Sequence, residues 1–171
     1  ENFNKHHGLA KTARWKAFNK FRKIRGKKLE QHALYEAIFQ YFKAQDSTSW
    51  GWTCWPEAYQ NPNNKEVKAF GRKHKDRVLY FTWLQWLAEE QLEAAQQAAI
   101  EAKMSVGIYR DLAVGVDREG SDVWNDCSYY CLDASVGAPP DGLAPQGQNW
   151  GLPPFNPVAL YNGRYAPFIE M

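Results

Sequence analysis

The sequence lacks the features that mark several large classes of protein. Its 171 residues include only three cysteines, Cys54, Cys127 and Cys131. Three are too few for a disulfide framework, so we expect a reducing, cytoplasmic compartment. No apolar run approaches the roughly 20 residues that cross a bilayer. No signal-peptide pattern, P-loop, dinucleotide fingerprint or Gly-x-Ser-x-Gly motif occurs. We therefore expect no contact with a membrane.

No sign of charge dominates the whole chain, but the two signs are unevenly distributed. The net charge is +2, yet residues 1–28 carry ten Lys or Arg and a single Glu. The rest of the chain is consequently acidic overall. A basic segment of this kind is most simply a solvated helix face, and nucleic-acid binding is the alternative.

The composition is that of a folded domain. Hydrophobic residues make up 44% of the chain and aromatic residues 15%, which excludes collagen-like and wholly disordered chains. A domain of this length can bury roughly 70% of the surface that it exposes when unfolded. We therefore expect one core of ordinary size.

Helical periodicity is the main structural signal. Apolar residues recur at helical spacing over residues 9–26 and 29–44, with Gly26 breaking the pattern between them. Asn64 is a candidate N-cap for a short helix to His74, and Asp76 for a long one over 77–103. A further short helix is expected near 121–131, and another begins at Tyr165.

The amino-acid composition changes after the long helix. Residues 105–110 are apolar and β-branched, which predicts a strand buried on both faces. Residues 117–157 form a long Pro- and Gly-rich loop, and loops of that length are usually functional. We expect a mainly helical fold with little sheet. It comprises a helical accessory region (1–60) and a part (61–171) in which the long helix and the strand make half of an α/β repeat.

The ends of the chain favour a piece of a longer protein. The first methionine is Met104, and the chain stops barely one turn into the helix expected from Tyr165. An isolated turn of helix is unstable because nucleation is costly.

Four polar or aromatic residues are candidates for ligand binding. Asp111 follows the expected strand, and chemistry in α/β folds gathers where strands end. Asp141, Gln148 and Trp150 combine carboxylate, amide and aromatic ring in the Gly/Pro-rich loop, a mixture that suits sugars. Each could instead be structural, Asp111 as a turn cap and Trp150 as a loop residue packed for stability.

Other clusters are less specific. Trp50, Trp52 and Trp55 could bind sugar or peptide, but more simply pack a loop onto helices. Cys127 and Cys131 have no third ligand in range, and the four histidines (His6, His7, His32 and His74) form no metal-binding pattern, so no metal site is expected.

Three segments carry a resemblance to a known family: residues 107–116 (GIYRDLAVGV), 134–141 (ASVGAPPD) and 147–154 (GQNWGLPP). They closely resemble the bacterial amylomaltases, the 4-α-glucanotransferases of glycoside hydrolase family 77. Residues 84–88 (LQWLA) and 55–62 resemble the long-form members. The similarity is weakest over residues 1–28.

The resemblance implies a fragment of a (β/α)8 barrel: one helix, the third strand, its long loop and a helical subdomain. It implies retaining transfer of α-1,4-glucan segments between maltooligosaccharides through two carboxylates, without cofactor or metal. Glucose or a maltodextrin is the acceptor, and no nucleic acid takes part. Asp111, Asp141, Gln148 and Trp150 match sugar-binding positions of the family.

The family's nucleophile lies in an Arg-x-Asp-His strand that these 171 residues do not contain. We therefore expect the chain to hold sugar-binding residues but none of the catalytic carboxylates, and to be inactive alone. A non-catalytic α-glucan-binding module is the principal alternative.

Overall fold

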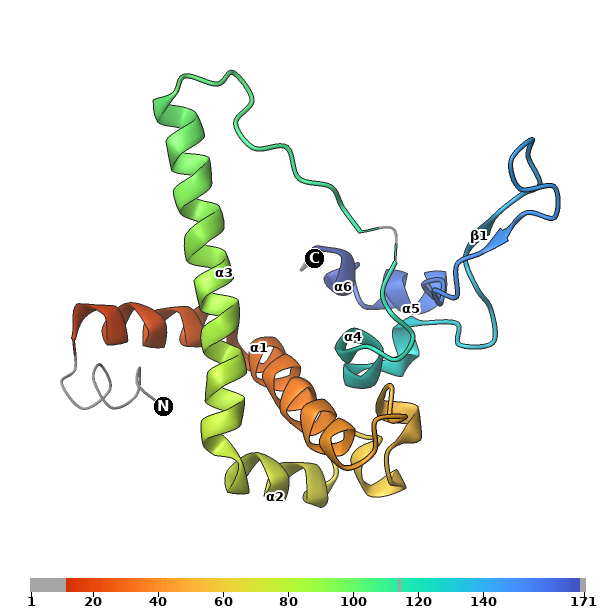
Figure 1. Ribbon diagram of the computed structural model, residues 1–171, viewed down its shortest axis with the longest axis horizontal. Coiled ribbons are helices and arrows are strands. Elements are labelled where there is room, and N and C mark those ends of the chain that lie inside the picture. The colour runs from red at the N-terminus through yellow and green to blue at the C-terminus, as the bar shows by residue number, and fades with distance from the viewer. Residues whose placement is uncertain (1–11, 114, 170–171) are drawn as a thin grey trace.

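The computed structural model describes residues 12–113 and 115–169 of the chain. The expected start of the first helix at residues 9–11, as well as His6, His7, Val114, Glu170 and Met171, lies outside this range. Figure 1 shows a mainly helical molecule in which a long helix, α3 (Lys75–Glu101), crosses a kinked helix, α1 (Ala13–Gln45). Helix α2 (Lys65–Lys73) joins the base of α3.

The break predicted at Gly26 is confirmed as a kink within α1. Gly26 has φ 57° and ψ −142°, a conformation that side chains with a Cβ rarely adopt. The bend divides α1 into two halves, and Leu29 of the second half belongs with Phe18 and Trp86 to one buried cluster. Phe18 in the first half packs on Trp86 of α3, with ring centroids 5.3 Å apart.

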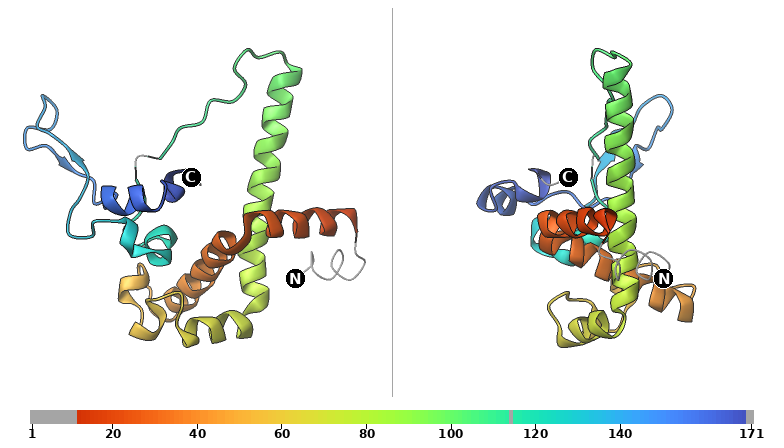
Figure 2. Two further views of the ribbon diagram at one scale, coloured as in Figure 1. Left: turned by 180° about the vertical axis from the view of Figure 1, so that it is seen from behind. Right: turned by 90° about the vertical axis from the view of Figure 1, so that its left-hand side faces the viewer.

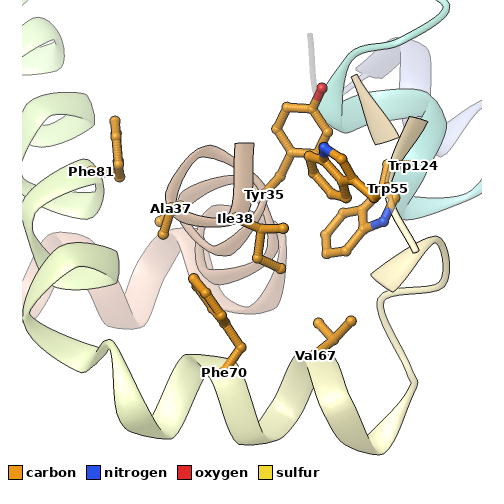
Figure 3. Close-up of a cluster of buried hydrophobic side chains, with 9 residues drawn as sticks. Tyr35, Ala37, Ile38, Trp55, Val67, Phe70, Phe81 and Trp124 are labelled. Atoms are coloured by element: carbon orange, nitrogen blue, oxygen red, sulfur yellow. The ribbon is translucent and has the colours of Figure 1, made fainter. Parts of the chain in front are cut away.

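The second half of α1 organises the larger core (Figure 3). Tyr35 and Ile38 pack with Trp55 and Trp124, while Val67 and Phe70 of α2 close the cluster from below. Trp124 belongs to α4 (Ser121–Asn125), so this core joins segments far apart in the sequence. Its aromatic rings meet at tilted or edge-to-face angles, the favourable arrangement for aromatic pairs.

The Trp-rich segment packs against the helices, as its simpler interpretation predicted. It contains two short 3-10 turns, η2 (Trp52–Cys54) and η3 (Glu57–Tyr59). Trp55 is 3% exposed in the core, and the Trp52 indole N–H donates to the Arg118 carbonyl at 3.1 Å. Trp50 alone of the three is largely exposed, with the Lys43 ammonium 3.7 Å from its ring centroid.

One of the two predicted helix N-caps is confirmed and the other is wrong. Asn64 is the N-cap of α2 as predicted, although its side-chain amide donates to the Ala58 carbonyl. Asp76 is not the N-cap of α3: that position is taken by His74, and Asp76 lies in the first turn. A carboxylate is favourable there too, because the helix N-terminus carries partial positive charge.

The prediction of a buried strand at residues 105–110 is wrong. This segment is irregular, with Val106 76% exposed and Tyr109 84% exposed. No other strand lies beside it among the described residues, and the Ile108 N–H instead donates to the Gln96 side chain at 2.9 Å. A parallel strand needs a neighbour for its backbone hydrogen bonds, so the apolar pattern alone is not enough.

The rest of the chain contains short elements. Turn η4 (Cys127–Tyr129) follows α4, in the region where a short helix was expected. Strands β1 (Gly137–Ala138) and β2 (Gln148–Asn149) form an antiparallel hairpin that projects away from the helices (Figures 1 and 2). Helix α5 (Pro157–Asn162) was not predicted, whereas α6 (Ala166–Ile169) begins where expected.

Candidate functional site

The hairpin of residues 137–150 brings two of the three resemblance segments together. Gly137 pairs with Asn149, and Ala138 with Gln148. A Cβ on Gly137 would lie 2.0 Å from the Gln148 carbonyl oxygen, so no larger residue fits without a shift of the backbone. Glycine thus allows the two strands to approach at the base of the loop.

Gln148 and Trp150 form a direct pair on this hairpin. The Trp150 indole N–H donates to Gln148 Oε1 at 2.9 Å, and the Trp150 backbone N–H donates to the Val136 carbonyl at 3.0 Å. Trp150 is 44% exposed. The pair therefore offers solvent an aromatic ring beside an amide nitrogen that can donate hydrogen bonds.

Asp141 shapes the tip of the same hairpin. Its Oδ1 accepts from the backbone N–H groups of Leu143 at 2.8 Å and Ala144 at 2.6 Å, while its own N–H donates to the Ala144 carbonyl. One carboxylate oxygen is thus used to form the turn. Because the side chain is exposed, the other oxygen remains accessible to a ligand.

Asp111 lies apart from the hairpin. It lines an open cavity of about 1120 Å³ together with residues of α1, α3 and α4, and neither Asp141, Gln148 nor Trp150 lines that cavity. The structure therefore brings Gln148 and Trp150 together and leaves Asp111 separate.

His32 lines the same cavity and was not singled out by the sequence. Its Nδ1 lies 2.9 Å from Ser121 Oγ, and its Nε2 lies 3.1 Å from the Gln85 amide nitrogen. Both ring nitrogens of His32 thus have a polar partner on another helix. The ring joins α1, α3 and α4, a role that no sequence spacing indicates.

Two tyrosines, Tyr35 and Tyr130, are buried. The Tyr35 hydroxyl donates to the Glu119 carbonyl, and burial, followed by the charges of Glu36, Asp117 and Glu119, raises the pKa of Tyr35. Burial, with smaller contributions from Asp122 and Asp126, raises the pKa of Tyr130 to about 12. Both tyrosines keep their protons in the folded chain at pH values where free tyrosine ionises.

These pKa shifts predict a loss of stability in alkali. Unfolded tyrosine ionises near pH 10, so above that pH the unfolded chain binds fewer protons than the folded chain. The free energy of unfolding must then fall as pH rises from about 10 toward 12. Urea unfolding at several pH values should show this fall, and Tyr130→Phe should make it shallower. Equal slopes for Tyr130→Phe and wild type would contradict the assignment.

The part of the chain that the structure describes shows neither a metal-binding cluster nor a membrane-spanning helix. Over residues 12–113 and 115–169, no group of three or more His, Cys, Asp or Glu side chains is arranged to hold a metal ion. None of the helices in these ranges is long and apolar enough to span a membrane.

Comparison with known proteins gives the family. The sequence profile of glycoside hydrolase family 77, described as 4-alpha-glucanotransferase, matches residues 1–171. The 4-alpha-glucanotransferase of Haemophilus influenzae is 39% identical over 173 residues, covering 99% of this chain and 25% of the relative. That of Mycobacterium bovis is 37% identical over 152 residues, covering 89% of this chain and 20% of the relative.

Two amylomaltases of known structure also match the chain. The amylomaltase from Corynebacterium glutamicum matches with a TM-score of 0.68 and 38% identity, over 90% of this chain and 19% of that chain. The amylomaltase from Streptococcus agalactiae, solved with acarbose, matches in fold with a TM-score of 0.80 at 20% identity, over 94% of this chain and 32% of that chain. The chain thus spans about a quarter or less of the length of the curated relatives named above. It belongs to the 4-alpha-glucanotransferase family, glycoside hydrolase family 77.

Proposed function

We propose that this chain is the part of a 4-α-glucanotransferase that binds the α-1,4-glucan near the acceptor side. Family membership supports the activity of the whole protein. The observation that carries the role of this part is the Trp150–Gln148 pair, displayed on an exposed hairpin. Asp111 is proposed as a further sugar-binding residue at a separate point of the chain.

The chemistry of the pair suits a glucan. The apolar face of a glucose ring stacks on the Trp150 indole, the Gln148 amide nitrogen donates to a sugar hydroxyl, and the accessible Asp141 oxygen accepts from another. Exposure of all three side chains fits a long, flexible substrate that approaches from solvent.

The transfer reaction itself needs groups outside these 171 residues. Retaining transfer uses a nucleophilic carboxylate and an acid/base carboxylate close together. No Arg-x-Asp-His sequence occurs in the chain. We propose that the chain binds maltooligosaccharides without turning them over, and that transfer requires no cofactor or metal.

The same proposal accounts for an exposed apolar stretch. Met104, Val106, Tyr109 and Leu112 are each more than half exposed after α3. A run of exposed apolar residues on a soluble protein usually marks a surface that another element covers. In the proposed parent, elements outside these 171 residues cover this stretch.

Titration calorimetry tests the proposed ligand. The full chain should bind maltoheptaose saturably and should not bind cellohexaose, a β-linked glucan that presents a different shape. Failure to bind maltoheptaose would contradict the proposal. Binding only to a polyanion such as heparin, with steep loss of affinity in salt, would favour the nucleic-acid alternative instead.

The gene sequence distinguishes two hypotheses, that the chain is part of an enzyme and that it is a non-catalytic glucan-binding module. An Arg-x-Asp-His strand encoded within a few tens of codons after Met171 supports a glucanotransferase. A stop codon directly after Met171 would favour a glucan-binding module.

A further inference from the structure

Arg118 lies at the base of the hairpin and contacts both of its arms. Its guanidinium donates to the carbonyls of Leu132 and Ala134, which precede β1, and to that of Gly151, which follows β2. The bond to Ala134 is 2.6 Å long and that to Gly151 is 3.4 Å. One side chain therefore joins the segments by which the chain enters and leaves the hairpin.

Other hydrogen bonds also join the two arms, among them Ser135 Oγ to Asn149 Oδ1 at 2.6 Å and the Asn156 N–H to the Tyr129 carbonyl at 2.8 Å. The Val136 N–H donates to the Leu152 carbonyl, and the Cys131 N–H donates to the Pro154 carbonyl, both at 2.8 Å. The Trp150 N–H donates to the Val136 carbonyl at 3.0 Å. Strands of two residues give marginal stability by themselves, so the added contacts at the base matter for the orientation of the loop.

The backbone around Arg118 is itself fixed to the helical region. The Arg118 carbonyl accepts from the Trp52 indole at 3.1 Å. The neighbouring Glu119 carboxylate accepts from the Thr53 hydroxyl at 2.5 Å, and the Glu119 carbonyl accepts from the Tyr35 hydroxyl. The segment that carries Arg118 thus connects the buried core to the hairpin.

We propose that Arg118 is the positioning residue for the glucan-binding hairpin, fixing Trp150 and Gln148 relative to the helical region. This inference rests on the proposed function, since it assumes that the hairpin binds glucan. Arginine suits the role because its planar guanidinium has five donors and no acceptor, and can serve three carbonyl oxygens in one geometry. A lysine ammonium, with its compact point charge, cannot reproduce that fork.

The test compares Arg118→Ala and Arg118→Lys in the full chain by two readouts. Amide hydrogen exchange at Val136 and Trp150 reports the order of the hairpin without any ligand. It should be at least about tenfold faster in both variants, because hydrogen bonds from a charged donor are lost. Affinity for maltoheptaose should fall by about five- to tenfold, with little change in the thermal midpoint.

Arg14→Ala is the matched control. Arg14 donates to Glu90 at 2.7 Å and lies over the Trp86 ring, so this variant also removes a bonded guanidinium, but from the helical region. It should lower the thermal midpoint while leaving hairpin exchange and glucan affinity unchanged. An equal loss of affinity in Arg14→Ala and Arg118→Ala would overturn the positioning role, because general destabilisation would then explain both.

The outcomes separate the two proposals. Unchanged exchange in Arg118→Ala, or faster exchange with unchanged affinity, overturns the role of Arg118 alone. A wild-type chain that binds no maltoheptaose overturns the proposed function, and with it the glucan role of Arg118. Retention of wild-type exchange and affinity by Arg118→Lys would overturn the argument from guanidinium geometry.

Discussion

Trp150→Ala should weaken the binding of maltoheptaose by at least about tenfold. The indole is 44% exposed, and its N–H is bonded to Gln148, so the ring is oriented by the same residue that we expect to contact the sugar. Truncation of a tryptophan at the centre of a binding surface costs about 2 kcal/mol or more, which exceeds the ~1.4 kcal/mol of a tenfold change. Calorimetric titration of the variant measures the effect directly.

Trp50→Ala is the control for this substitution. Trp50 is 68% exposed and belongs to the Trp-rich segment rather than to the hairpin. Its removal should leave maltoheptaose affinity within error of the wild type. If Trp50→Ala weakened binding and Trp150→Ala did not, the glucan site would lie on the Trp-rich segment instead.

Trp124→Ala should cause a large loss of stability. Trp124 is 1% exposed, packs between Tyr35 and Trp55, and donates its indole N–H to the Tyr59 carbonyl at 2.9 Å. Removal of a large buried aromatic leaves a cavity and costs about 3–5 kcal/mol. The Tyr59 carbonyl also loses its partner. Since whole domains are stable by only about 5–15 kcal/mol, the variant should be partly unfolded at moderate urea.

Urea unfolding followed by far-ultraviolet circular dichroism checks this expectation. Trp50→Ala again provides the comparison, because an exposed substitution should change the free energy of unfolding by about 0.5 kcal/mol or less. Equal midpoints for Trp124→Ala and Trp50→Ala would contradict the core shown in Figure 3.

The helices were predictable because their information is local. The spacing of Phe18, Phe21 and Ile38 marks the buried faces of α1, although Ile24, which the same spacing placed with Phe18 and Phe21, is 70% exposed. Gly26 marks the kink, since glycine is the residue that tolerates its backbone angles. α6 likewise begins near Tyr165 as expected. Helix α5 was missed even though Asn156 caps it and Pro157 opens it, because its sequence shows no apolar periodicity.

The features that the sequence did not predict correctly depend on contacts between distant segments. Residues 105–110 have the composition of a buried strand, but a strand also needs a partner, which their own sequence does not specify. The Trp150–Gln148 pair could be anticipated as a cluster because the two residues are close in sequence. The contacts of Arg118 and His32 could not be anticipated. The partners of Arg118 lie 14 to 33 residues away and those of His32 lie 53 and 89 residues away. The division near residue 60 and the sugar-binding roles stay predictions.

Proton NMR of maltotriose mixed with the full chain tests most directly whether this is a glucan-binding part of the enzyme without its catalytic carboxylates. We expect the sugar signals to broaden saturably as protein is added, while the distribution of oligosaccharide lengths stays constant over hours. The appearance of glucose and longer maltooligosaccharides would contradict the absence of catalytic carboxylates. Signals that do not broaden at any protein concentration would contradict glucan binding.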